Sequence, residues 1–132
     1  MVVVCRSLSR VYRTEAVPVQ ALTSVDIDIA AGEFVSLSGP SGSGKSTLLN
    51  LIGGLDRPSE GEVIVDGVAL RGLNEAQLAD LRLTKIGFVF QAYNLIPVLS
   101  ARENVEFIMQ LQGVAARERR SRALAILDSL GI

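Results

Sequence analysis

Residues 39–47 read Gly39-Pro40-Ser41-Gly42-Ser43-Gly44-Lys45-Ser46-Thr47. This run fits the pattern of a glycine, any four residues and Gly-Lys-Ser/Thr, which wraps a loop around nucleotide phosphates. Its three glycines tolerate positive φ and let a phosphate approach the backbone without a Cβ in the way. Lys45 is placed to reach the β- and γ-phosphates, Ser46 to bind Mg²⁺ through its hydroxyl, and Thr47 to make a secondary phosphate contact. The run therefore predicts a phosphate loop.

The segments on either side of this loop predict the strand and the helix that it needs. Residues 34–38, Phe34-Val35-Ser36-Leu37-Ser38, are a short apolar run that ends at Gly39 and predicts a buried strand. The loop opens a helix, whose N-terminal amides and dipole add to the attraction for phosphate. Gly53-Gly54 and Pro58 bring the helix to an end. The apolar residues of this helix surround most of its circumference, which predicts burial on nearly all sides: Leu48, Leu49, Leu51, Ile52 and Leu55.

Three further segments predict an antiparallel sheet near the N-terminus. Residues 24–29 alternate strictly, with Val25, Ile27 and Ile29 on one face of a half-exposed strand. Residues 2–11 and 62–65 are also runs of strand length. The dipeptide Asp-Gly directly after residue 65 is a strong signal for a hairpin turn.

The second half of the chain predicts mainly helices. Asn74 and Gln77 fit the N-cap and the third position of a short amphipathic helix. Residues 86–90 are a second candidate for a buried strand. Two helices are predicted after that, at 101–112 and 116–130, with a glycine between them. The expected fold class is α/β.

Composition places the chain among ordinary globular proteins. It has 132 residues, of which 48% are hydrophobic and 20% charged, and this balance argues against disorder. The net charge of -1 gives no general attraction to nucleic acid. Four arginines do gather in the last predicted helix, but Glu118 lies among them, which favours a solvated face. These are Arg117, Arg119, Arg120 and Arg122.

The cysteine and histidine content and the hydropathy argue against a disulfide-linked protein, a soft-metal site and a membrane-spanning chain. Cys5 is the only cysteine and histidine is absent, so no disulfide can form within the chain and soft metals have almost no ligands. We expect Cys5 to be a small buried apolar residue. No run reaches the roughly 18 apolar residues of a membrane span, and no signal peptide is recognisable. The expected location is cytoplasmic, with any membrane role supplied by a partner.

An ordered set of segments around the phosphate loop resembles the first half of an ATP-binding cassette (ABC) ATPase. The chain looks most like the subunits of the lipoprotein-releasing and macrolide-exporting subfamily of ABC transporters. The resemblance implies a RecA-like P-loop NTPase fold, with the nucleotide-binding core at 1–98 and the incomplete start of a helical subdomain at 99–132. The resembling segments are Arg10-Val11-Tyr12-Arg13, Val19-Gln20-Ala21-Leu22, Ser41 to Asp56, Pro58-Ser59-Glu60-Gly61, Ile86 to Leu95 and Glu103-Asn104-Val105.

The resemblance also implies roles for residues outside the loop. Tyr12 matches the aromatic residue that stacks on adenine, and the alternative is a tyrosine packed at a sheet edge. Gln91 matches the glutamine of the family's Q-loop, whose side-chain oxygen contacts Mg²⁺ or the attacking water. The alternative for Gln91 is an ordinary polar residue at a strand end. Residues 93–97 would then face a membrane partner, against the alternative of a plain surface loop.

Ligands, partners and location follow from the same resemblance. The implied ligands are ATP and Mg²⁺. The implied partners are a transmembrane permease and a paired ABC subunit, at the inner face of the plasma membrane, and nucleic acid is not among them.

Three parts of the family pattern do not occur in this sequence: the Leu-Ser-Gly-Gly-Gln signature, an apolar strand ending in Asp-Glu, and a switch histidine. Residues 63–66 superficially resemble the apolar strand, but Gly67 stands where the catalytic glutamate should be. We therefore identify no catalytic residue. The expectation is a truncated, marginally stable chain of an ATPase family that turns over ATP poorly by itself.

Three functions remain in competition at this point. The leading one is the ATP-binding subunit of an ABC transporter, which in full length couples ATP hydrolysis to substrate export or lipoprotein release. The second is a nucleotide-binding module without catalysis that acts by assembly or regulation. The third is a small P-loop kinase, against which the ordered match after residue 58 stands.

Overall fold

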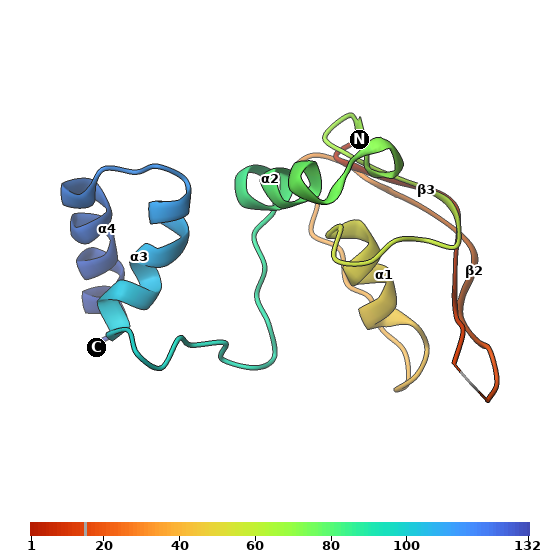
Figure 1. Cartoon of the computed structure of the whole chain (residues 1–132), viewed down its shortest axis with the longest axis horizontal. Coiled ribbons are helices and arrows are strands. Elements are labelled where there is room, and N and C mark those ends of the chain that lie inside the picture. The colour runs from red at the N-terminus through yellow and green to blue at the C-terminus, as the bar shows by residue number, and fades with distance from the viewer. Residues whose placement is uncertain (15) are drawn as a thin grey trace. The chain divides into compact units, whose positions relative to one another are not determined.

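The computed structural model describes residues 1–14 and 16–132, and the chain divides into two units. The first unit runs from Met1 to Arg82 and the second from Leu83 to Ile132. Figure 1 shows the strands in the first unit and the pair of helices, α3 and α4, in the second. The elements are β1 (Val3–Tyr12), β2 (Val19–Ile29), α1 (Lys45–Ile52), β3 (Glu60–Val65), β4 (Val68–Ala69), the 3₁₀ turn η1 (Leu70–Gly72), α2 (Glu75–Lys85), α3 (Ala101–Leu111) and α4 (Ala116–Ser129).

The sheet of the first unit is antiparallel throughout and has the strand order β2-β1-β3-β4. β2 keeps the alternation seen in the sequence. Val25, Ile27 and Ile29 are half-buried, while Asp26 and Asp28 between them are exposed. This period of two is that of a strand with one covered face. The predicted antiparallel sheet near the N-terminus is confirmed.

The turn between β3 and β4 is dictated by two residues. Asp66 and Gly67 have φ values of 48° and 78°, and a type I′ turn requires positive φ at both of its central positions. Val65 pairs with Val68 across the turn. β3 is thus one arm of a hairpin, as the Asp-Gly dipeptide predicts.

The core of the first unit forms where α1 packs on the sheet. Cys5, Leu8 and Val63 of the sheet are almost fully enclosed, and Leu48 and Leu51 of α1 are buried against them. Burial raises the pKa of the Cys5 thiol, so this side chain is neutral near pH 7. Cys5 therefore behaves as the small buried apolar residue that the sequence predicts.

α1 is covered on one side only, which corrects the prediction that it is buried on nearly all sides. Leu49 is 56% exposed, and Leu55, just past the end of the helix, is also exposed. The reason is geometric, since one sheet covers only one face of a helical cylinder. Apolar residues that point away from the sheet consequently remain in solvent.

α2 begins with the reciprocal cap that the sequence predicts. The backbone N–H of Gln77 donates to Asn74 Oδ1, and the backbone N–H of Asn74 donates to Gln77 Oε1, each over 2.9 Å. These bonds satisfy donors that have no partner inside the helix. Leu78 and Leu81 form its buried side.

The second unit contains a helical hairpin whose helices agree with the predicted ranges to within a residue. Ser100 and Glu103 form a capping box at the start of α3. The hydrogen bond from the Ser100 backbone N–H holds the pKa of Glu103 below its usual value. Gly113, between the helices, has a φ of 80°. Within the described ranges, neither unit has a helix of the length and apolar character that crossing a bilayer demands.

A buried carboxylate joins the two helices of this hairpin. Glu106 of α3 is 7% exposed, and it accepts from Arg102 over 2.9 Å and lies 4.0 Å from Arg119 of α4. Arg119 also donates to the carbonyl of Val114 over 3.1 Å. Arg119 therefore points toward α3, which corrects the prediction that all four arginines of α4 lie on a solvated face. A buried carboxylate needs counter-charges, and Arg119 supplies one of them.

Two predicted strands are not formed. Neither 34–38 nor 86–90 belongs to a strand, and the sheet consists of four other segments. A strand exists only beside a hydrogen-bonded neighbour, and the described residues give these two runs none. Their apolar side chains are consequently in solvent, with Phe34 98% exposed and Val89 fully exposed.

Candidate functional site

The phosphate loop passes directly into the first turn of α1. Gly42 and Gly44 have φ values of 81° and 94°, and Gly44 is the N-cap of the helix. A Cβ at Gly44 would lie 2.6 Å from the carbonyl oxygen of Ala21 in β2, so only glycine fits between the loop and the sheet. Gly39 departs from the expectation, because its φ is not positive. A Cβ there would instead lie 2.9 Å from Ser43 Oγ, so Gly39 permits a close contact within the loop.

Lys45 closes the loop on itself. Its Nζ donates to the carbonyl oxygens of Gly39 and Pro40 over 2.6 and 2.8 Å and to Ser43 Oγ over 3.1 Å. The ammonium group is thereby held over the loop by groups that carry no net charge. Phosphate oxygens would offer the same group full negative charge, and such charge-assisted bonds are the stronger ones.

A cavity of about 550 Å³ brings the loop and Tyr12 together within the first unit. β1 and β2 supply one part of its lining, and the loop with the first turn of α1 supplies the other. Of the predicted site residues in this unit, Gly39, Pro40 and Ser43 do not line the cavity, and each accepts a hydrogen bond from Lys45, which does. The lining residues are Tyr12, Val19, Gln20, Ala21, Ser41, Gly42, Gly44, Lys45, Ser46 and Thr47.

Ser46 is suited to the metal role that the sequence assigns to it. Its side chain is exposed at the N-terminal end of α1 and makes no hydrogen bond to the described part of the chain, so its oxygen is free to accept a ligand. A hydroxyl oxygen is a hard donor of the kind that Mg²⁺ takes alongside phosphate oxygens and water. Gln91, the other predicted metal contact, belongs to the second unit, and its role remains a prediction.

A polar cluster beside the cavity was not anticipated as part of the site. The guanidinium of Arg10 lies over the ring of Tyr12, 4.5 Å from its centroid, and forms an ion pair with Asp56. The Tyr12 hydroxyl lies 3.3 Å from Asp56 Oδ2 and 3.4 Å from Thr47 Oγ1. Arg10 and Asp56 are 46 residues apart in the sequence, so no short sequence pattern predicts their contact.

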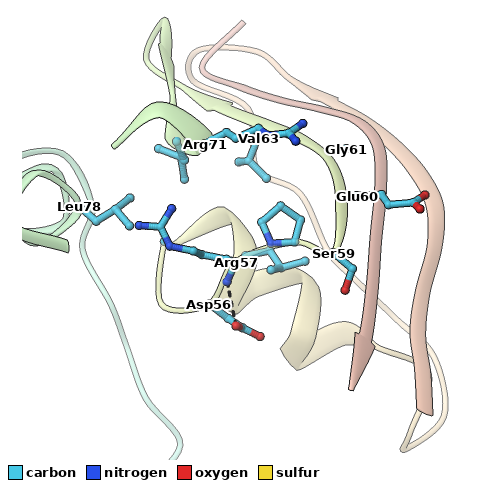
Figure 2. A pocket seen from close by; sticks show the side chains of 12 residues that line it. Asp56, Arg57, Ser59, Glu60, Gly61, Val63, Arg71 and Leu78 are labelled. Carbon is cyan, nitrogen blue, oxygen red and sulfur yellow. Dashed lines mark hydrogen bonds between the residues drawn. The ribbon is translucent and has the colours of Figure 1, made fainter. Parts of the chain in front are cut away.

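A second cavity, of about 230 Å³, lies near the far end of α1 (Figure 2). Leu51, Val63 and Leu78 give it mainly apolar walls. Figure 2 shows the Arg57 backbone N–H bonded to the carboxylate of Asp56, and this bond is 2.8 Å long. Asp56 thus lines this cavity and also contacts Tyr12, which lines the first one.

Arg57, which also lines the second cavity, is hydrogen-bonded to residues near the start of α2. The Arg57 guanidinium donates to Glu75 Oε1 over 3.1 Å and to the Leu73 carbonyl over 2.8 Å. This arrangement braces the segment after α1 against the start of α2. Arg57 therefore contacts Asp56 through its backbone N–H and the region at the start of α2 through its guanidinium.

Comparison with known proteins places these features in a family. Residues 22–132 match the family described as "ABC transporter". The ABC transporter ATP-binding protein MJ0796 of Methanocaldococcus jannaschii is 48% identical over 125 residues, which cover 92% of this chain and 53% of that protein. A dimeric structure of MJ0796, described as a post-hydrolysis state bound to ADP and Pi, superposes with a TM-score of 0.89 at 46% identity and covers 96% of this chain and 56% of that one.

Two relatives whose names describe transport systems match over nearly the whole of this chain. The lipoprotein-releasing system ATP-binding protein LolD of Chromohalobacter salexigens is 44% identical and covers 97% of this chain and 54% of its own length. The macrolide export ATP-binding/permease protein MacB of Wolinella succinogenes is 46% identical and covers 96% of this chain and 20% of its own length. The chain spans about half the length of the curated relatives that match it first.

Proposed function

Since this chain belongs to the ABC transporter family of ATP-binding proteins, we propose that its first unit binds ATP in the cavity between Tyr12 and the phosphate loop. One observation carries the proposal. A single cavity is lined at once by an aromatic ring suited to a base and by a glycine-rich loop at a helix N-terminus suited to phosphates.

The chemistry of each contact follows from the geometry of the loop. The N-terminal amides of α1 and the loop amides attract the phosphates, while Lys45 exchanges its carbonyl partners for phosphate oxygens. Mg²⁺, which neutralises phosphate charge when bound, would be held by Ser46 and, in the assembled site, by Gln91. Tyr12 would stack on adenine.

The activity of the whole protein is a wider proposal. We propose that the complete protein hydrolyses ATP, pairs with a second ABC subunit, and couples hydrolysis to export or lipoprotein release through a permease at the inner face of the plasma membrane. The names of LolD and MacB support this reading, as does the dimeric structure of MJ0796. In that protein we expect residues 1–98 to belong to the nucleotide-binding core and 99–132 to open the helical subdomain.

A nucleotide-binding module without catalysis is the second candidate. The observation that favours it is the Asp66-Gly67 turn after β3, where a segment that superficially resembles the family's apolar strand carries a hairpin glycine in place of the catalytic glutamate. The two candidates differ in turnover, because a passive module binds Mg-ATP and releases no phosphate when a second subunit and the permease are present.

Lys45→Ala tests the ATP site directly. Loss of a charged hydrogen-bond donor is worth about 1.5 to 3 kcal/mol, so we expect the Kd for Mg-ATP to rise by roughly one to two orders of magnitude. Isothermal titration calorimetry measures the change. Arg71→Ala is the matched control, since Arg71 is an exposed cation of the same unit that lies outside the ATP cavity. Equal affinities of Lys45→Ala and the unmodified protein would exclude the proposed site.

A further inference from the structure

We propose that Arg10 is a positioning residue for the nucleobase. It holds the ring of Tyr12 in the orientation that a base requires, so the affinity contributed by the base depends on Arg10 and the affinity contributed by the phosphates does not. This inference rests on the proposed function, because it concerns the same cavity.

Strand geometry brings Arg10 and Tyr12 together. The two residues are two positions apart on β1, and residues at that spacing project from the same face of a strand. The guanidinium carbon lies 4.5 Å from the centroid of the ring, well inside the range of a cation–π contact. Arg10 therefore covers one face of the ring. We expect a base to stack on the other face, because Tyr12 lines the ATP cavity and Arg10 does not.

Asp56 fixes the guanidinium in that place. Arg10 Nε donates to Asp56 Oδ2 over 2.9 Å, and Arg10 Nη2 donates to Asp56 Oδ1 over 3.1 Å. Two parallel bonds of this kind set the plane of the guanidinium as well as its position. The side chains of Arg10 and Asp56 are only 24% and 27% exposed, so water screens the pair less than it screens a surface ion pair.

The hydroxyl of Tyr12 holds the ring less firmly than Arg10 does. Its distances of 3.3 Å to Asp56 Oδ2 and 3.4 Å to Thr47 Oγ1 exceed the usual 2.7 to 2.8 Å of an O–H···O bond. The Tyr12 hydroxyl hydrogen serves one acceptor at a time, so both contacts form together only when Tyr12 donates to Asp56 and the Thr47 hydroxyl donates to Tyr12. Arg10 is consequently the principal restraint on the ring.

The contacts of Tyr12 also connect its ring to α1, the helix that follows the phosphate loop. Thr47 lies in the first turn of α1, and Asp56 lies four residues beyond its last residue, Ile52. Tyr12 contacts the side chains of both. The distance between the Tyr12 ring and the phosphate loop is thus set by α1. The ion pair of Arg10 with Asp56 adds a further link between β1 and the end of α1.

Two ligands separate the base from the phosphates in the test. The Kd of the full chain is measured for Mg-ATP and for inorganic tripolyphosphate with Mg²⁺, by calorimetry, with the unmodified protein and with Arg10→Ala. We expect Arg10→Ala to raise the Kd for ATP by about 5- to 30-fold, the range that a partly desolvated cation–π contact is worth. The Kd for tripolyphosphate should stay within about twofold, because among the described residues Arg10 bonds to Asp56 and lies over Tyr12, and makes no hydrogen bond or ion pair to the phosphate loop.

The chain offers a matched control on the same strand. Arg6 of β1 forms an ion pair with Asp28 over 2.6 Å, and both side chains are about half exposed. Arg6→Ala removes an arginine and an ion pair from β1 without touching Tyr12, so both affinities should remain unchanged. Should Arg10→Ala fold poorly, Arg10→Lys keeps the charge and the stem but loses the planar fork, and a selective loss of ATP affinity is still expected.

A spectroscopic measurement reports on Tyr12 itself. The protein has two tyrosines and no tryptophan, so in the Tyr93→Phe background Tyr12 is the only tyrosine that fluoresces. Saturating ATP should quench this fluorescence through stacking, and tripolyphosphate should not. Arg10→Ala should reduce the quenching at saturation.

The outcomes distinguish the inference from the function on which it rests. An equal loss of affinity for both ligands would mean that Arg10 merely supports the fold, and an unchanged ATP affinity would mean that it does not position Tyr12. Either result overturns the inference and leaves the ATP site in place. If the unmodified protein binds neither ligand, the proposed function fails and the inference fails with it.

Discussion

Gly44 lies at a φ of 94° with the carbonyl oxygen of Ala21 immediately behind its Cα. The position has two separate requirements, a left-handed backbone and an absent side chain. Gly42 shares the first requirement at a φ of 81°, but an added Cβ there meets nothing within 4 Å. The two glycines of one loop therefore allow strain and steric overlap to be measured separately.

Gly42→Ala should lower the free energy of unfolding by about 1 to 2 kcal/mol, the usual strain of a left-handed non-glycine residue. Gly44→Ala should lower it further, because the new Cβ also overlaps the Ala21 carbonyl and must push β2 away from the loop. Urea denaturation followed by circular dichroism measures both changes. Equal losses would show that β2 yields to the added methyl group at no cost.

At the scale of the element, the helix caps show how closely sequence and structure agree where the interactions are local. The Asn74–Gln77 and Ser100–Glu103 pairs are each three residues apart and make reciprocal hydrogen bonds. The sequence predicts the first pair, and the second carries the same pattern. Helix bounds in this chain can be predicted because the groups that satisfy the terminal amides lie within one turn of them.

Ser100→Ala should lower the stability of α3 by about 0.5 to 2 kcal/mol, because the backbone N–H of Glu103 loses its acceptor. Hydrogen exchange of the first-turn amides of α3 measures the loss locally. Ser121→Ala is the control, since Ser121 is an exposed serine inside α4 and no cap depends on it. A comparable loss in the control would refute the role of the cap.

Glu103 makes the same cap sensitive to acid. Its pKa is lowered in the folded state, chiefly by the Ser100 backbone N–H, so its contribution is fully present above the unfolded pKa of about 4.3. That contribution is lost as the pH falls through the lower, folded pKa. Glu103→Gln keeps the acceptor and removes the titration, so exchange protection of α3 should become flatter with pH in this variant.

The strands and the site residues are harder to predict from the sequence than the helix caps are. Residues 34–38 have the composition of a strand, but a strand also depends on a neighbour that composition cannot specify. The phosphate loop is predictable from nine consecutive residues. Arg10 and Asp56 are not, because their contact depends on how β1 packs against the end of α1. Sequence patterns therefore predict the parts of the site that are contiguous and miss the parts assembled by packing.

At the scale of the whole molecule, large apolar side chains are exposed in both units. Phe34, Val89 and Tyr93 are each more than nine-tenths exposed, beside segments that no strand neighbour covers. A segment with apolar side chains and backbone N–H and C=O groups that no strand partner satisfies is a template for pairing with another chain. The molecule should therefore self-associate as its concentration rises.

Phe34→Asp should shift the association equilibrium toward monomer. Burying one phenylalanine is worth roughly 1.5 to 3 kcal/mol, so the dissociation constant should rise by at least about tenfold. Sedimentation velocity over a concentration series measures it. Val17→Asp places the same charge at another exposed apolar residue, outside the strands. If both variants dissociate equally, added charge and not the 34–38 segment is responsible.

The pairing of β1 with β3 also has a consequence in time. Val3 pairs with Val65, so the sheet joins the two ends of a long stretch of chain, and the phosphate loop lies between them. During translation at roughly 5 to 20 residues per second, β1 waits about 3 to 12 seconds before β3 exists. β2 is made first and can pair with β1 in the meantime. The nascent protein therefore spends several seconds with an incomplete sheet. The rate of translation sets how soon β3 completes the sheet that supports the phosphate loop.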